Sequence, residues 1–295
     1  MKTLPLLLVS LVTLGSFGSF GSLSAQQQNP YQPGGPYPHR MGQPSREALV
    51  VPGRTLGLRP YLFVEQYDLE ETSGGSRFVS EEGQFYGIGL NWSAGLTPRL
   101  RLDALLEGFI GEVDYSGGLQ NLFTGEVTPL EDDTDYLGVR VETNVVMPYS
   151  LANGMLFEPF LGLGLRSFSR DLGSPSEGGY VEDWTSIYAL LGTGLIGDLS
   201  PQSQWFAKGA LAYPLYNVNS TDRRGSADDL EPGRELFWFA ELGLRRGRLE
   251  AAAFWKFYQF SASDSVTTNE GLFSITSRQP ATDIAMIGLR LGWTF

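Results

Sequence analysis

From Thr55 onward, apolar and polar residues alternate in ten stretches that are separated by polar connections. Side chains of a β-strand point to opposite faces in turn, so a period of two predicts strands. We expect these strands near residues 56–67, 84–93, 100–111, 135–147, 155–169, 184–199, 205–218, 236–245, 248–260 and 282–295. The stretches at 184–199 and 205–218 are the weakest, which leaves eight or twelve strands as alternatives.

The connections between these stretches alternate between short and long. The short ones are centred on residues 96–99, 150–154, 200–203 and 246–247, and the long ones span 68–83, 112–134, 170–183, 219–235 and 261–281. Short turns at one end and long loops at the other are typical of transmembrane barrels. The pattern therefore predicts an all-β fold, a closed antiparallel up-and-down transmembrane β-barrel of about ten strands over residues 55–295. A soluble β-sandwich is the alternative fold.

One face of the expected strands is apolar and should meet lipid. It is clearest in two strands, where the apolar residues are Leu137, Val139, Val141, Val145, Met147, Leu161, Leu163 and Leu165. Aromatic residues of membrane barrels gather at the two membrane interfaces. We expect such girdles to include Trp92, Trp205, Trp238, Trp255, Trp293, Tyr149 and Tyr213.

The opposite face carries charges of both signs on nearly every strand. Isolated buried charges are costly, so charges inside a narrow barrel should pair across neighbouring strands. The predicted lumen network comprises Arg59, Glu65, Arg101, Asp103, Glu107, Arg140, Glu142, Glu158, Arg166, Glu241, Arg245, Glu250, Lys256 and Arg290, with Lys208 on the same face. Bulky residues should share this face: Tyr61, Phe63, Phe109, Phe160, Phe168, Phe254 and Tyr258. The same polar groups could instead line a narrow channel.

The first 54 residues differ from the rest in composition. Residues 1–25 have a basic start, an apolar core and a small-residue cleavage site, which predict a signal peptide. Residues 26–54 are rich in Gln, Pro and Gly and should form a disordered periplasmic arm.

The chain stops on an aromatic residue at the end of a strand whose apolar face carries Leu289, Leu291, Trp293 and Phe295. This ending resembles the closing strand of bacterial outer-membrane β-barrels, in which a terminal Phe marks the chain for insertion. The size is similar to that of small barrels of the OmpA, OmpX and OmpW type. The resemblance implies a location in the cell outer membrane, contact with lipid and lipopolysaccharide, and assembly by the barrel-assembly machinery.

Composition excludes several functions. The sequence has no cysteine, so it cannot form a disulfide, a zinc-thiolate site or a thiol nucleophile. A net charge of -12 argues against nucleic acid as a partner. Omptin, PagP-like and PagL-like barrel enzymes are similar in size, but their catalysis uses a histidine, and the only one here, His39, precedes the barrel. We expect no enzyme activity, no catalytic residues, no metal and no cofactor.

The predicted long loops carry most of the acidic residues. One hypothesis is that Ca²⁺ or Mg²⁺ binds the set Glu131, Asp132, Asp133 and Asp135, because hard cations favour clustered carboxylates. The alternative is a solvated loop that binds no ion. The loops could also bind an extracellular ligand. The leading functional interpretation is a structural or surface-interaction protein, with a narrow porin-like channel as the alternative and a barrel enzyme as a less favoured one.

Overall fold

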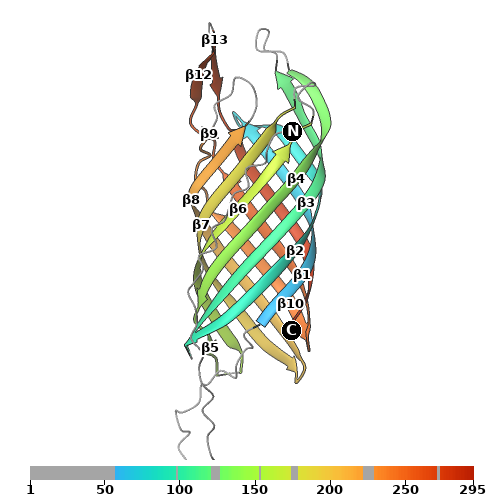
Figure 1. Ribbon diagram of the computed structural model, residues 1–295, viewed down its shortest axis with the longest axis vertical. Coiled ribbons are helices and arrows are strands. Elements are labelled where there is room, and N and C mark those ends of the chain that lie inside the picture. Colours follow the sequence, from blue (N-terminus) through green and yellow to red (C-terminus); the bar gives the residue numbers. More distant parts are fainter. Residues whose placement is uncertain are drawn as a thin grey trace, which may run out of the picture. The chain divides into compact units, whose positions relative to one another are not determined.

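The computed structural model describes residues 57–97, 99–120, 127–152, 154–173, 179–221, 229–270 and 273–295. The predicted signal peptide and arm lie outside these residues. Among the described residues, no helix is long and apolar enough to cross a membrane. Ten long strands form the structure (Figure 1): β1(Gly57–Ser73), β2(Ser76–Thr97), β3(Leu100–Gln120), β4(Val127–Val146), β6(Leu156–Asp171), β7(Val181–Ser200), β8(Ser203–Thr221), β10(Phe237–Arg246), β11(Leu249–Phe260) and β14(Ala281–Trp293).

The ten strands close into a barrel. Each is antiparallel to its neighbours in the order β10, β11, β14, β1, β2, β3, β4, β6, β7, β8, and β10 also pairs with β8. Closure satisfies every strand edge, which a sandwich does not do. The predicted fold class and strand number are therefore confirmed, and the observed fold is the one implied by the resemblance to outer-membrane barrels.

Four short strands accompany the ten long strands of the barrel. β5(Tyr149–Ser150) pairs with β6, and β9(Asp229–Leu230) pairs with β8. β12(Val266–Glu270) and β13(Phe273–Ser277) form a separate hairpin beyond one rim (Figure 1). We call that rim the loop end. The opposite rim, the turn end, holds Arg99 and the short connections at 201–202 and 247–248, together with Gly57 and Phe295.

Two predicted loops are mostly strand. The segment 68–83 continues β1 and β2 up to a tight turn at Gly74 and Gly75, whose φ angles of 60° and 82° suit glycine. The segment 112–134 likewise extends β3 and β4. The prediction of loops was wrong because the outward residues here are charged, like Glu70 and Glu82. The outward face is therefore no longer apolar, and the alternation of apolar and polar residues that predicts a membrane strand is lost.

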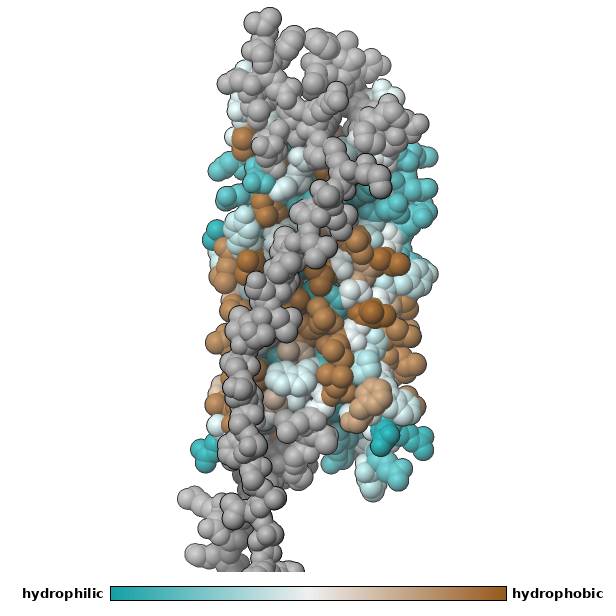
Figure 2. Space-filling view, viewed as in Figure 1, coloured by the Kyte–Doolittle hydropathy of each residue, from teal (hydrophilic) through white to brown (hydrophobic). Residues whose placement is uncertain are grey.

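The outside of the barrel carries an apolar belt. The predicted lipid-facing residues point outward, and Leu137 and Leu161 are each 61% exposed. Figure 2 shows this apolar zone between hydrophilic zones towards the two ends. The predicted girdle residues Trp92, Trp238, Trp255, Trp293, Tyr149 and Tyr213 are also exposed. At the end of the chain, the Phe295 side chain is exposed and its backbone N–H donates to the Leu58 carbonyl at 3.5 Å.

Inward aromatic side chains lie across glycines of neighbouring strands. A Cβ atom at Gly87 would come within 2.2 Å of the Phe63 ring, and one at Gly138 within 2.2 Å of the Phe109 ring. Because glycine has no side chain, each ring can lie flat against the next strand. This arrangement lets a narrow barrel hold many rings at one level.

Candidate functional site: the barrel lumen

A layer of aromatic side chains crosses the middle of the lumen. All its members are at most 6% exposed, and each of the ten long strands except β8 and β14 contributes one or more. The rings contact one another in series, for example Phe85 with Phe109 at 5.5 Å and Phe168 with Trp184 at 6.0 Å between centroids. We call this set the aromatic layer: Phe63, Tyr67, Phe85, Phe109, Tyr136, Phe168, Trp184, Tyr188, Phe237, Phe254, Tyr258 and Phe260.

Some ring contacts join strands that are not neighbours in the barrel. Trp184 of β7 contacts Phe260 of β11 at 5.3 Å, and Phe260 contacts Phe237 of β10 at 5.2 Å. The inward positions predicted for Phe63, Phe109, Phe168, Phe254 and Tyr258 are confirmed, as are those of Tyr61 and Phe160. Stacked and edge-on rings of this kind pack as densely as a protein core.

Arg166 lies within the aromatic layer. Its guanidinium carbon is 4.7 Å from the Phe168 ring centroid, 4.3 Å from that of Tyr258 and 5.5 Å from that of Phe109. In the described part of the chain Arg166 forms no ion pair, so its predicted place in the ion-pair network was wrong. At its level the inward neighbours are rings, and cation–π contact takes the place of a carboxylate.

Towards the turn end, the predicted charges form a network, here called the turn-end network. Its deepest part is centred on Lys256, whose Nζ lies 2.8 Å from Glu65 Oε2 and 3.5 Å from Glu107 Oε2. Arg140 donates to the same Glu107 oxygen at 3.0 Å, and Tyr61 donates its hydroxyl proton to Glu107 Oε1 at 2.7 Å. Each carboxylate at this depth therefore has a cation beside it.

Nearer the rim of the turn end, some charged side chains form ion pairs with more than one partner. Arg101 pairs with Asp103 and with Glu158, both at 2.7 Å. On the opposite side, Glu250 accepts hydrogen bonds from three arginines. These are Arg59 at 2.9 Å, Arg290 at 2.7 Å and Arg245. Arg290 also pairs with Glu241 at 2.8 Å. Arg140 pairs with Glu142, likewise at 2.8 Å. The structure thus brings every predicted network residue except Arg166 into an ion pair.

A cavity of about 160 Å³ lies within the turn-end network. Its walls mix charged side chains with apolar ones such as Phe160, Ile196 and Phe206. Lys208 also lines it and is exposed, although it points inward, so the cavity is accessible at this side of the barrel.

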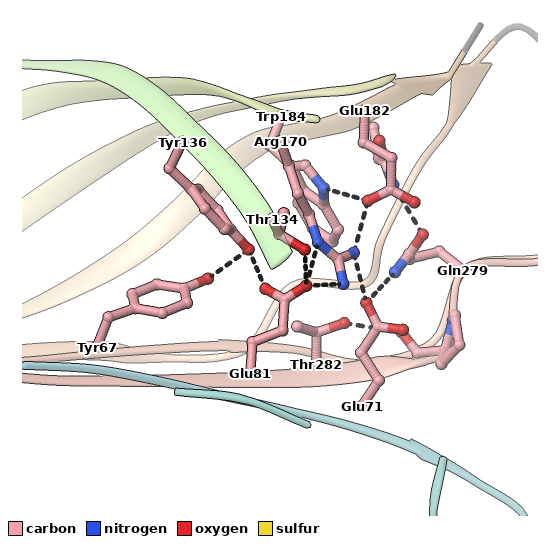
Figure 3. A network of polar contacts seen from close by, with 12 residues as sticks. Tyr67, Glu71, Glu81, Thr134, Tyr136, Arg170, Glu182, Trp184, Gln279 and Thr282 are labelled. Carbon is pink, nitrogen blue, oxygen red and sulfur yellow. Dashed lines mark hydrogen bonds and ion pairs between the residues drawn. The ribbon is translucent and has the colours of Figure 1, made fainter. Parts of the chain in front are cut away.

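Towards the loop end, three buried carboxylates surround one guanidinium (Figure 3). Arg170 Nη2 lies 2.6 Å from Glu81 Oε1, and its Nη1 lies 2.9 Å from Glu182 Oε2 and 3.2 Å from Glu71 Oε1. All four side chains are at most 7% exposed. We call them the loop-end cluster.

Neutral donors complete the loop-end cluster (Figure 3). Trp184 Nε1 donates to Glu182 at 3.0 Å, Gln279 Nε2 donates to Glu71 at 3.3 Å, and the Tyr136 hydroxyl donates to Glu81. The cluster lies beyond the apolar belt, because the exposed outward residues at its level are acidic, as at Glu70 and Glu82.

The loop-end cluster contains more carboxylates than cations. Burial raises the pKa of the Glu71 carboxyl to about 7, and the nearby Glu182 and Glu81 carboxylates act in the same direction, whereas Arg170 opposes them. One guanidinium cannot neutralise three carboxylates. Glu71 is therefore the group of the cluster that can take up a proton near neutral pH.

Sequence reasoning missed the loop-end cluster because its members fell in predicted loops. A signal was present: the inward series that begins at Glu65 continues with the same period through Tyr67 and Leu69 to Glu71. Arg170 likewise continues the inward series of β6 after Phe168.

The proposed cation set lies on β4. Glu131, Asp133 and Asp135 share the outward face, and Asp132 has the opposite parity. Asp133 pairs in register with Asp114, and Asp135 pairs with both Glu112 and Asp171. Within the described ranges, no group of three or more His, Asp or Glu side chains has the geometry to hold a metal ion. Cation binding by this set stays a prediction.

The chain was compared with known proteins. No family model matches it, and no curated protein matches it. Among solved structures, it is similar to the outer-membrane protease OmpT of Escherichia coli, with 9% identity over 81% of this chain and 97% of that chain and a TM-score of 0.48.

Two further matches are an outer-membrane channel from Pseudomonas putida F1 and the β-domain of the Bordetella autotransporter BrkA. The channel has 10% identity over 87% of this chain and 100% of its own, with a TM-score of 0.40. The β-domain has 11% identity over 82% and 100%, with a TM-score of 0.41. At these identities the matches concern the fold alone, and no activity is carried over from them.

Proposed function

We propose that this protein is an outer-membrane β-barrel with a closed lumen and a structural or surface-interaction role. The observation that carries this proposal is the aromatic layer, in which buried rings from eight of the ten long strands pack in series and some contacts join strands that are not neighbours, as Tyr67 of β1 with Tyr136 of β4. Rings packed as densely as a protein core obstruct a hydrated ion unless they move apart, and the one guanidinium at that level, Arg166, is itself enclosed by rings.

The outer surface supports the proposed location. An exposed apolar belt on a closed antiparallel barrel would be unfavourable in water and suits the hydrocarbon core of a bilayer. The aromatic residues near its borders suit the two interfaces. The polar strand extensions beyond the belt then provide a rigid surface outside the bilayer for a partner.

Enzyme activity is not part of this proposal. The only histidine of the sequence precedes the barrel, and the carboxylates of the lumen are engaged with arginine or lysine. A carboxylate held by a guanidinium is a poor general base near neutral pH.

Single-channel recording in planar lipid bilayers tests the closed lumen. The purified full chain should insert without conductance steps at two salt concentrations, and protease protection should show that it is inserted. Steps that scale with salt would overturn the proposal and favour the narrow channel.

A variant with a thinned aromatic layer serves as the positive control. In Phe85→Ala/Phe168→Ala, two rings of the series are lost, and the chain should conduct if the layer is the barrier. A shift in gel mobility between unheated and heated samples checks that the variant barrel is folded. A folded variant that stays silent would show that the layer alone does not close the lumen.

A further inference from the structure

If the lumen is closed as proposed above, the turn-end cavity is a pocket and not part of a passage. The aromatic layer closes its deep side, and the exposed Lys208 marks its open side. Its volume of about 160 Å³ is similar to that of engineered cavities of about 150 Å³ that hold benzene in other proteins. A molecule of roughly that size therefore fits the cavity.

The charges around the cavity are balanced except at one cation. Seven basic and five acidic side chains line it. Glu65 and Glu250 lie just behind this lining and pair with Lys256 at 2.8 Å and with Arg290 at 2.7 Å, so they compensate these two cations. Lys208 is the lining cation that no ion pair compensates among the described residues, and an anion in the cavity would have its charge partner there.

Two cationic groups at the cavity have unused donors. Lys208 forms no ion pair in the part of the chain that the structure describes, and its ammonium lies 4.7 Å from the Phe160 ring centroid. Arg290 is nine-tenths buried, and its Nε atom has no hydrogen-bond partner there. Buried polar atoms are normally satisfied, so the unpartnered Nε leaves Arg290, which lines the cavity, with a hydrogen-bond capacity that its protein neighbours do not use.

The rest of the wall suits an apolar body. Phe160, Phe206, Ile196 and Val146 line the cavity between the charged groups. Convergent polar groups among apolar walls are the usual composition of small-molecule sites. We infer that the turn-end cavity binds a small organic anion, a carboxylate with an apolar body of about the size of benzoate, with its charge towards Lys208 and Arg290.

Isothermal titration of the detergent-purified full chain with benzoate tests this inference. Benzoate should give a saturable heat, and benzyl alcohol, which has the same ring without the charge, should bind at least about tenfold more weakly. The absence of saturable heat with benzoate, or equal binding of benzyl alcohol, would overturn the inference.

Two variants locate the site. Lys208→Met removes the unpaired cation and should weaken benzoate binding about tenfold. Arg77→Gln removes one positive charge at the exposed loop end and should leave binding unchanged. Unchanged binding in folded Lys208→Met would place the anion elsewhere and overturn the site. Because a dead-end pocket can bind without conducting, this result is independent of the bilayer recordings.

Discussion

Buried charges are compensated differently at the two ends of the lumen. At the loop end, one guanidinium serves three carboxylates, and Arg170 is only 2% exposed. At the turn end, cations and carboxylates alternate, and rim groups such as Arg59 are 25% exposed. The comparison shows that one barrel can hold a concentrated, dry cluster and a distributed, partly hydrated network, separated by the aromatic layer.

The largest expected effect comes from removing the single cation of the loop-end cluster. Arg170→Met leaves three buried carboxylates without a counter-charge, and breaking a buried ion pair typically costs about 3–5 kcal/mol. The free energy of unfolding should fall by that amount in urea titrations of the barrel in lipid vesicles, followed by tryptophan fluorescence.

Arg59→Met is the matched control for that variant. Glu250 loses one guanidinium but keeps Arg245 and Arg290, and Arg59 is partly exposed, so the loss should be about 1 kcal/mol or less. Equal losses in the two variants would contradict the contrast between the two ends.

The second prediction concerns pH and the loop-end cluster. The pKa of Glu71 is raised from 4.5 to about 7, so the folded protein holds this proton more tightly than the unfolded chain. The stabilisation by Glu71 is fully present below about pH 4.5 and is lost as the pH rises through about 7. The loss corresponds to about 3 kcal/mol, since one pKa unit is about 1.4 kcal/mol.

Glu71→Gln isolates that titration. The amide keeps the shape and both hydrogen-bond capacities but cannot ionise, so the variant should lack this part of the pH dependence between pH 5 and 8. The measurement compares the unfolding free energies of the two proteins at each pH in this range. Parallel curves would show that Glu71 does not titrate there.

The third prediction contrasts Arg166 with Arg170. Arg166 has ring contacts but, among the described residues, no carboxylate partner, so replacing it leaves no anion uncompensated. Methionine can fill the space and contact the rings. Arg166→Met should change the unfolding free energy by only about 1–2 kcal/mol in either direction, because lost cation–π contact and removed desolvation oppose each other. A loss as large as that of Arg170→Met would show that an anion accompanies Arg166.

The period of two was sufficient to predict the barrel and the charged face of its lumen. Ten strands and the inward positions of Tyr61, Glu107 and Arg140 follow from alternation alone. Alternation gives the face of a residue but not its neighbours on other strands, because these depend on the cross-strand register. Arg166 was therefore assigned to the ion pairs, although the register surrounds it with rings.

The loop-end cluster was missed for a different reason. The outward residues change from apolar to acidic where β1 and β2 leave the apolar belt, and this change was interpreted as the start of a loop. The inward residues continue unchanged past that level, as Leu69 and Val79 show. A prediction from the inward-facing residues alone would therefore have extended β1 and β2 to the level of the loop-end cluster.

The smallest expected effect on stability is that of replacing Lys208. It is best measured beside the replacement of Lys256, a second lysine that lines the same cavity. Lys256 is buried and lies beside Glu65 and Glu107, so Lys256→Met should destabilise the barrel by several kcal/mol, in the range of about 3–5 for a broken buried pair. Lys208 is exposed to the cavity, forms no ion pair among the described residues and lies over the Phe160 ring, so Lys208→Met should cost about 0.5–1 kcal/mol. Urea titrations of both variants under one condition check this. A cation at the cavity that contributes so little to folding is available to a ligand, whereas a large loss of stability in Lys208→Met would mean that it stabilises the barrel instead.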